Sequence, residues 1–348
     1  MGLSATQAEA VTISYNDLIN DPTSLQNQIS KAFGSEPDCL GIVVVKDLPD
    51  GYAPLREQLL KIAYEFASLP EDEKEKSVDA ASRYSYGWSH GKEIMNGVPD
   101  VLFQGSFYAN PIIDEPEVTP AKRKEFLEYH CRNIWPEKTG LEKAFKELGQ
   151  FVFNVGTKLA AACQPFVDSH QSAVSLPDMF KKPYTTKGRL LHYFPPPANF
   201  VQDDNEALDS WCGLHLDHSV LTGLCSAMYL EAGEPGAPPK VVPSPSPASG
   251  LYIKTRGGTV AKVNIPVNCL AFQTGEALEI ATDGRLRATP HFVHVGYGGD
   301  KASVVSRETF ALFMQPTVEQ ILSTKGDEVV TFGSFSKKIF SEHYEATM

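Results

Sequence analysis

Seven short runs of β-type residues follow one another through the second half of the chain, and they limit the folds that this sequence can adopt. Turn residues such as Asp283-Gly284 and Gly298-Gly299-Asp300 separate several of them. Many short strands at this spacing are typical of an all-β sandwich or barrel. The runs are Arg189 to Phe194, Ser219 to Leu230, Gly250 to Lys254, Lys262 to Ile265, Cys269 to Thr274, Leu286 to Val295 and Thr309 to Met314.

The first half of the chain has mostly helical patterns. Residues 52–69 are amphipathic, residues 120–166 predict two consecutive helices, and residues 41–45 form a β-branched run that favours a buried strand. We therefore predict one structural unit that is mainly β. In it, a strand and helix region of residues 1–184 supports a β core of residues 185–316, and a tail of residues 317–348 follows.

Charge and cysteine content exclude several classes of protein. The net charge is −12, whereas nucleic-acid binding needs clustered Lys and Arg. Six cysteines without a C-x-x-C pair indicate free thiols in a reducing compartment. No run of 18 apolar residues and no signal-peptide pattern occurs. We expect a cytoplasmic monomer that binds neither nucleic acid nor membrane.

The stretch from Gly213 to Ser219 places an imidazole and a carboxylate two residues apart. In a β-strand, residues i and i+2 project from the same face, so His215 and Asp217 can hold one metal ion together, whereas His218 would point away. Such triplets often arise by chance. The pair therefore indicates a metal site only if further ligands follow in strands of matching phase.

Two later stretches offer the missing groups. His291 and His294 are three residues apart, so in one strand they face opposite sides and only one of them can point inward. Arg307 and Thr309 share a face. A planar bidentate cation beside a hydroxyl donor suits a carboxylate ligand.

Taken in order, these motifs resemble those of the iron(II)- and 2-oxoglutarate-dependent oxygenases of the isopenicillin N synthase-like family. The resemblance spans most of the chain. The matching stretches are His215-Leu216-Asp217-His218 with Leu221-Thr222-Gly223-Leu224, Gly275-Glu276-Ala277-Leu278-Glu279 with Asp283 to His291, Arg307-Glu308-Thr309-Phe310 with Phe313 and Pro316, and His192-Tyr193-Phe194-Pro195-Pro196.

The resemblance implies a double-stranded β-helix, or jelly roll, with a helical N-terminal layer and a C-terminal helical tail. It implies that His215, Asp217 and His291 hold Fe(II), which leaves positions open for 2-oxoglutarate and O2. Arg307 and Thr309 would hold the far carboxylate of 2-oxoglutarate. Decarboxylation to succinate and CO2 would then be coupled to hydroxylation, desaturation or oxidative cyclisation of a small-molecule substrate.

The chain departs from the family pattern at several positions. His192 replaces the usual Asn and Phe194 the usual second Tyr, so the match does not support the family's usual hydrogen bonds from this strand to the cosubstrate; His192 is the candidate that is left to donate one. Phe292 replaces an Arg that is common after the distal histidine. The long spacing from His291 to Arg307 predicts a hairpin extension at residues 296–303.

The aromatic and glycine-rich segment of residues 83–92 is either a packed loop or a substrate-facing loop. In the second case it forms part of the substrate pocket, together with Phe292 and the loop from Ala232 to Ser249. The expected pocket residues are Tyr84, Tyr86, Trp88, His90, Lys92 and Phe292. An aromatic lining of this kind does not name a substrate.

Two other functions remain open at this point. Isopenicillin N synthase itself oxidises its substrate without 2-oxoglutarate and retains an R-x-S motif, so Arg307 and Thr309 do not prove cosubstrate use. The other alternative is a non-catalytic jelly-roll binding module, which the presence of all three expected metal ligands disfavours.

Overall fold

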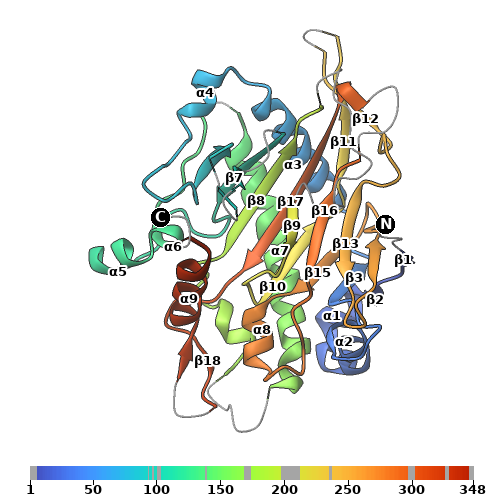
Figure 1. The fold of residues 1–348 in the computed structure, drawn as a ribbon, viewed down its shortest axis with the longest axis vertical. Helices are drawn as coiled ribbons and strands as arrows, with labels where there is room; N and C mark the ends of the chain where they lie inside the picture. The colour runs from blue at the N-terminus through green and yellow to red at the C-terminus, as the bar shows by residue number, and fades with distance from the viewer. Residues whose placement is uncertain are drawn as a thin grey trace.

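Two large β-sheets enclose a cavity, and helices pack on the outer face of the larger sheet (Figure 1). The computed structural model describes residues 6–92, 94–95, 98–99, 103–137, 139–167, 174–196, 212–234, 237–296, 302–325 and 329–344. Part of the hairpin extension expected at residues 296–303 lies outside these ranges. Within them the chain is mainly β, as expected.

The larger sheet combines strands from both halves of the chain. Strands before residue 185 pair directly with later ones, so the hydrogen-bond ladder continues across that boundary. In order across the sheet, the strands are β2 (Val11–Ser14), β3 (Ile42–Lys46), β15 (Leu270–Thr274), β10 (Leu221–Cys225), β17 (Val305–Met314), β8 (Lys187–Tyr193), β7 (Gln104–Ala109) and β4 (Gly87–His90). Strand β11 (Met228–Glu231) pairs with β17 and with β12 (Lys240–Val242).

The smaller sheet carries the second wall of the cavity. Its strands, in order, are β1 (Thr6–Ala8), β14 (Val260–Val263), β13 (Gly250–Lys254), β16 (His291–His294) and β9 (Cys212–His215). Strand β3 shows how the layers stack. Val43 and Val45 pack in the core on the helical side, whereas Ile42 and Val44 pack in the core between the sheets. A strand buried on both faces accounts for the continuous β-branched run.

Helices α3 (Tyr52–Ala67) and α7 (Leu141–Cys163) pack on each other and on β17. Helix α7 also approaches β10 closely, since a Cβ atom at Gly223 would lie 2.4 Å from Cγ1 of Val152. The other helices are α1 (Tyr15–Asn20), α2 (Gln26–Phe33), α4 (Glu71–Glu75), α5 (Pro120–Glu125), α6 (Leu127–His130), α8 (Glu276–Ala281) and α9 (Phe332–Tyr344). Shorter elements are η1 (Pro22–Leu25), η2 (Gln164–Phe166), η4 (Pro177–Phe180), η5 (Ala302–Val304), β5 (Ile94–Met95), β6 (Val98–Pro99), β18 (Ile321–Ser323) and β19 (Val330–Thr331). None of the helices in the described ranges has the length and apolar character needed to cross a membrane.

Strands β4 and β7 differ from the sequence-based expectation. Residues 87–90 show no strand period in the sequence, yet they form β4, which pairs with β7. Both strands are buried on nearly all positions, so polar and apolar residues do not alternate along them. Residues 120–130 form two short helices, α5 and α6, where one longer helix was expected.

Lys187 is a buried lysine at the start of β8. Its Nζ donates hydrogen bonds to the carbonyl oxygens of Ser85 (2.7 Å) and Glu128 (2.5 Å), and it lies 3.7 Å from the ring centroid of Tyr86. Burial lowers the pKa of Lys187 to about 7, although the nearby Glu128 and Cys131 oppose this effect. Lys187 therefore ties the segment before β4 and helix α6 to the central sheet.

We expect Lys187→Met to destabilise the protein by about 1–3 kcal/mol, because two buried carbonyl oxygens lose their donor. In the unfolded chain the pKa returns to about 10.5. Between pH 7 and 10.5 the unfolded state thus binds more protons, so the stability contributed by Lys187 rises with pH and is progressively lost as pH falls from 10.5 to 7. Urea denaturation at pH 7 and 9 should show a larger difference between wild type and variant at pH 9. The same substitution at the exposed Lys182 should have little effect at either pH; an equal loss there would contradict this account.

Candidate metal centre and cavity

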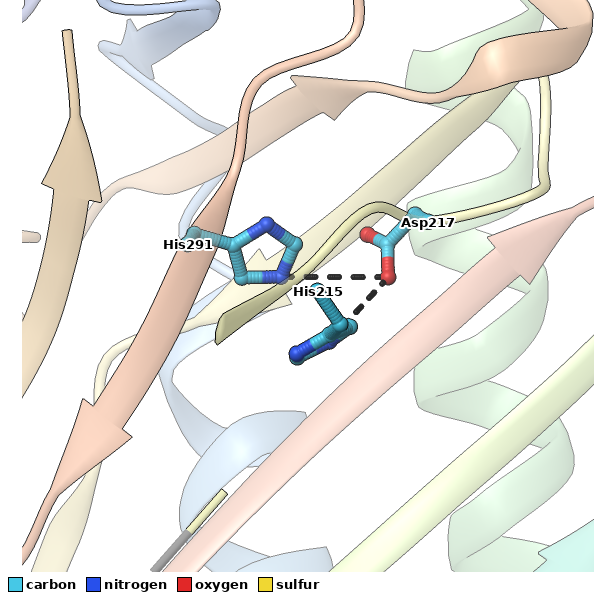
Figure 2. Close-up of side chains that lie close together, drawn as sticks. All are labelled: His215, Asp217 and His291. Atoms are coloured by element: carbon cyan, nitrogen blue, oxygen red, sulfur yellow. Dashed lines mark ion pairs between the residues drawn. The ribbon is translucent and has the colours of Figure 1, made fainter. Parts of the chain in front are cut away.

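His215, Asp217 and His291 form the one group of three or more potential metal ligands found in the described residues, with their ligand atoms within 4.8 Å of one another. His215 ends β9 and His291 begins β16, and the two are register partners. Asp217 follows β9 in the turn that leads to β10. Its Oδ1 lies 3.7 Å from Nε2 of His215 and 3.8 Å from Nε2 of His291 (Figure 2).

Backbone hydrogen bonds orient both imidazoles. Nδ1 of His215 lies 2.7 Å from the carbonyl oxygen of Gly213, and Nδ1 of His291 lies 3.0 Å from that of Thr289. A carbonyl oxygen can only accept, so each Nδ1 carries the proton and each Nε2 carries a lone pair. Metal-binding histidines are commonly held in this way. Dashed lines in Figure 2 join Asp217 to the imidazoles of His215 and His291, in both cases through Nε2.

The charges at the site suit a divalent cation. Burial raises the pKa of Asp217, but His291, His215, a hydrogen bond from Thr222 and His218 together outweigh that effect and hold it below its ordinary value. Burial lowers the pKa of His291. Asp217 is therefore ionised and His291 neutral near pH 7. Moreover, Asp217 Oδ2 is buried and has no hydrogen-bond partner, an arrangement that is costly unless a ligand completes it.

The turn after β9 places Asp217 correctly because Gly275 allows close packing. The amide of Glu276 donates to the carbonyl oxygen of Asp217 (2.8 Å). A Cβ atom at Gly275 would lie 2.0 Å from the carbonyl oxygen of Ser219, so no larger residue fits there. The triad thus depends on this turn as well as on strand phase, since Asp217 lies beyond the end of β9.

The two remaining candidate histidines do not join the site. Nδ1 of His218 lies 2.6 Å from Oε2 of Glu276, which confirms that His218 points away. His294 packs edge-on against Tyr252, with ring centroids 6.1 Å apart. In β16, therefore, His291 faces the cavity and His294 does not.

The cavity beside the triad has a volume of about 300 Å³ and is lined by both sheets. Arg307 and Thr309 of β17 line the same cavity as the three ligands. Arg307 is buried, its Cζ lies 4.9 Å from the ring centroid of Tyr193, and its Nε and Nη1 have no hydrogen-bond partner. These two nitrogens are buried donors without an acceptor among the described residues.

The structure contradicts the expected role of His192. His192 is the register partner of Glu308, and its Nδ1 lies 2.9 Å from Glu308 Oε1, on the face of the sheet opposite to Arg307. The neighbouring residue, Tyr193, is the register partner of Arg307 and lines the cavity. Of these two neighbours on β8, Tyr193 faces the cavity and His192 does not.

The expected substrate-pocket residues of segment 83–92 do not line the cavity either. The Tyr86 hydroxyl donates to the carbonyl oxygen of Tyr129 (2.7 Å), and Trp88 packs edge-on against Phe66 (5.3 Å). Tyr84 is half-buried with a left-handed backbone (φ 59°), His90 stacks on Phe194 (4.8 Å), and Lys92 pairs with Glu75 (3.4 Å). These contacts favour the packed-loop alternative.

Phe292 also faces away from the cavity, because it alternates with His291 along β16. Its ring stacks on Tyr252 at 5.2 Å. By contrast, the expectation for the loop of residues 232–249 is met in part, since Ser244, Ser246 and Ser249 line the cavity.

Sequence reasoning missed several polar residues of the cavity lining, among them Arg189, Thr222, Lys262 and Gln273 of β15. Gln273 is 1% exposed, and neither atom of its side-chain amide has a hydrogen-bond partner. The available signal was a single polar residue within the otherwise apolar run of residues 269–273.

No protein-family model and no curated protein sequence matches this chain. Solved structures of low identity share its fold. One, from Caulobacter crescentus, is provisionally assigned to the 2OG-Fe(II) oxygenase family (19% identity, 97% of this chain and 100% of that chain, TM-score 0.68). Another is a full-length Neurospora crassa protein in complex with alpha-KG and thymine (15% identity, 98% of this chain and 98% of that chain, TM-score 0.65). A third is the Arabidopsis thaliana dioxygenase for auxin oxidation 1 with 2-oxoglutarate (17% identity, 88% of this chain and 93% of that chain, TM-score 0.54).

Proposed function

We propose that this chain is an Fe(II)- and 2-oxoglutarate-dependent oxygenase of the isopenicillin N synthase-like type that acts on a small molecule. The observation that carries the proposal is the cluster of His215, Asp217 and His291 in the wall of a cavity that also contains the buried Arg307. The shared fold of the Neurospora crassa protein and the auxin dioxygenase, both solved with 2-oxoglutarate, supports it. We further propose that the two sheets form a jelly-roll core with a helical N-terminal layer and a C-terminal helical tail.

The residues of the cluster fit Fe(II). Two imidazole nitrogens and one carboxylate on one side of an ion match the 2-His-1-carboxylate arrangement of non-haem iron oxygenases. Both Nε2 atoms carry lone pairs because Nδ1 donates to a carbonyl oxygen in each ring. The buried, unpartnered Oδ2 of Asp217 is a further acceptor at the same place.

The cavity also suits a dicarboxylate cosubstrate. Arg307 would pair with the distal carboxylate of 2-oxoglutarate through Nε and Nη1, with the Thr309 hydroxyl beside it. Tyr193 packs under the guanidinium group and limits its movement. In the proposed cosubstrate site, Tyr193 takes the place that was expected for His192.

Bound Fe(II) would supply the activation of O2 that converts 2-oxoglutarate to succinate and CO2 and oxidises the substrate. The chain itself would contribute orientation and exclusion of water. Arg307 fixes one end of the cosubstrate, and the apolar side chains of Leu191, Leu224 and Val293 cover the space beside the triad. Hydroxylation, desaturation and oxidative cyclisation all remain compatible with this arrangement.

The substrate is proposed to be a small molecule because the cavity is enclosed by the two sheets and limited to about 300 Å³. The Neurospora crassa protein was solved with thymine, a molecule of suitable size. We also propose that the protein is a cytoplasmic monomer without a nucleic-acid partner, as its net charge of −12 and its cysteine content suggest.

Succinate release tests the proposed function. We expect the purified protein with Fe(II), ascorbate and O2 to form succinate from 2-oxoglutarate, even slowly without substrate, and chromatography with mass detection measures it. Omitting iron should stop the reaction. Oxidation of a substrate without any requirement for 2-oxoglutarate would instead favour an isopenicillin N synthase-like oxidase. Failure to bind Fe(II) or Mn(II) would favour a non-catalytic binding module.

A further inference from the structure

Gln273 presents an unsatisfied amide to the cavity. Its side chain is 1% exposed and belongs to the cavity lining, and neither Nε2 nor Oε1 has a hydrogen-bond partner. Leaving a buried amide without partners is unfavourable by about 1–3 kcal/mol. An apolar side chain of the same length would avoid this penalty. The amide therefore has the character of a group kept for a ligand.

The position of Gln273 separates it from the proposed cosubstrate site. Across the sheet, Gln273 is the register partner of Thr222, and Thr222 is the register partner of Phe313. Arg307 is six residues before Phe313 on the same strand, or about 20 Å along it at 3.3 Å per residue. Gln273 and Arg307 are therefore separated along the cavity wall, and Gln273 is not part of the carboxylate site formed by Arg307 and Thr309.

Gln273 lies instead close to the segment that carries Asp217. The hydroxyl of its partner Thr222 is 2.9 Å from that of Ser219, two residues after Asp217. Thr222 and Phe313 are uncharged, and the charged ligand Asp217 is an anion. Bound Fe(II) would offset the charge of Asp217, so the hydrogen-bonding groups of Gln273, and not net charge, would select the ligand group here.

The chemistry of a primary amide defines what it can recognise. It offers an N–H donor and a C=O acceptor side by side, and its complement is a group with an acceptor and a donor in the same arrangement. Lactams, cyclic imides and carboxamides have such an edge. Leu224, Leu251 and Val263 are apolar residues of the same cavity lining, which also contains Lys262 and Asn264.

We propose that Gln273 is a specificity-determining residue that pairs with the lactam, imide or carboxamide edge of a small, neutral and otherwise apolar substrate. This inference rests on the proposed function, since it takes the cavity as the substrate site. Gln273 would fix the orientation of the substrate through two hydrogen bonds, with the apolar remainder of the molecule against the smaller sheet.

Ligand-observed saturation-transfer NMR on the full-length protein tests this proposal, with and without the diamagnetic ion Zn(II) and 2-oxoglutarate. The probes are δ-valerolactam, uracil and cyclohexanecarboxamide, compared with N-methyl-δ-valerolactam, 1,3-dimethyluracil and cyclohexanecarboxylate. We expect saturable binding of at least one N–H amide. Its N-methylated or acid counterpart should bind about tenfold more weakly or worse.

Substitutions at Gln273 test whether this residue causes the preference for N–H amides. Gln273→Met removes both polar atoms at similar length, and Gln273→Glu replaces the donor with an acceptor; each should weaken binding of the N–H amide by about tenfold or more. Gln150→Met, on the exposed surface of α7, should leave it unchanged. The melting temperature of Gln273→Met should not fall, because the amide it removes has no partners.

The proposal is overturned if no probe binds, if the N-methylated or acid counterpart binds as well as the N–H amide, or if Gln273→Met binds the amide like wild type. Its failure is distinct from failure of the proposed function. Amide binding without 2-oxoglutarate turnover would refute the oxygenase and keep the amide site. Turnover of 2-oxoglutarate without amide binding would support the oxygenase and refute the amide site at Gln273.

Discussion

Asp217→Ala is expected to lower metal affinity by about a hundredfold or more and to abolish succinate formation. Loss of a hydrogen bond to a metal ligand typically weakens metal binding about 10–100-fold, and removing the ligand itself should do at least as much. The metal-free variant should still unfold cooperatively, because Asp217 Oδ2 has no partner to lose. Calorimetric titration with Mn(II) and chromatographic detection of succinate measure the two effects.

His218→Ala is the matched control for this prediction. It lies next to Asp217 in the sequence, but its imidazole is paired with Glu276 and points away from the triad. We therefore expect this variant to retain metal binding. Equal loss in both variants would mean that the turn, and not ligation by Asp217, determines affinity. Normal turnover by Asp217→Ala would refute the metal assignment.

Arg307→Ala is expected to raise the KM for 2-oxoglutarate by about thirtyfold or more. Truncating one partner of a buried, hydrogen-bonded charge pair costs about 2–5 kcal/mol, and about 1.4 kcal/mol corresponds to a factor of ten. Metal affinity without cosubstrate should stay near that of wild type, because Arg307 is not a ligand. Steady-state succinate formation at varied 2-oxoglutarate concentration measures the change.

Two further variants define this role. Arg307→Lys keeps the charge but loses the planar fork, so an intermediate KM is expected. Arg189→Ala removes the other arginine that lines the cavity, whose Nε donates to the Ser106 hydroxyl (3.0 Å), and it should affect the KM for 2-oxoglutarate much less. The opposite ranking of Arg189→Ala and Arg307→Ala would place the cosubstrate at the other end of the cavity.

The clustering of His215, Asp217 and His291 could be predicted because it depends largely on local rules. The two-residue spacing of His215 and Asp217 and the alternation of His291 and His294 each leave few arrangements, and the motif order selected one of them. The structure brings these three residues together. The turn through Gly275 that places Asp217 was not apparent, because it depends on a close approach between segments far apart in the sequence.

The residue beside Arg307 in the cavity could not be predicted, because its identity depends on strand register. A shift of one residue moves a side chain to the opposite face of a sheet. The pairing of Glu308 with His192 therefore decides that Tyr193, and not His192, faces the cavity. No local pattern contains that information.

In the fold, too, some strands could be predicted from the sequence and others could not. Strand β3 was predictable because four β-branched residues in succession indicate burial on both faces. Strands β4 and β7 are buried without such a run, so their sequences lack a recognisable period. The sequence therefore suggests a substrate loop around Trp88 of β4, although this side chain packs in the core against Phe66.

Binding of 2-oxoglutarate to the protein with and without Mn(II), measured by titration calorimetry, tests the central claim most directly. Mn(II) occupies oxygen and nitrogen sites of this type without supporting turnover. We predict saturable, one-to-one binding of 2-oxoglutarate that requires Mn(II) in wild type and that is lost in Asp217→Ala. Absence of binding in wild type, or binding of equal strength without metal, would contradict the assignment of His215, Asp217 and His291 as an iron centre for a 2-oxoglutarate-dependent oxygenase.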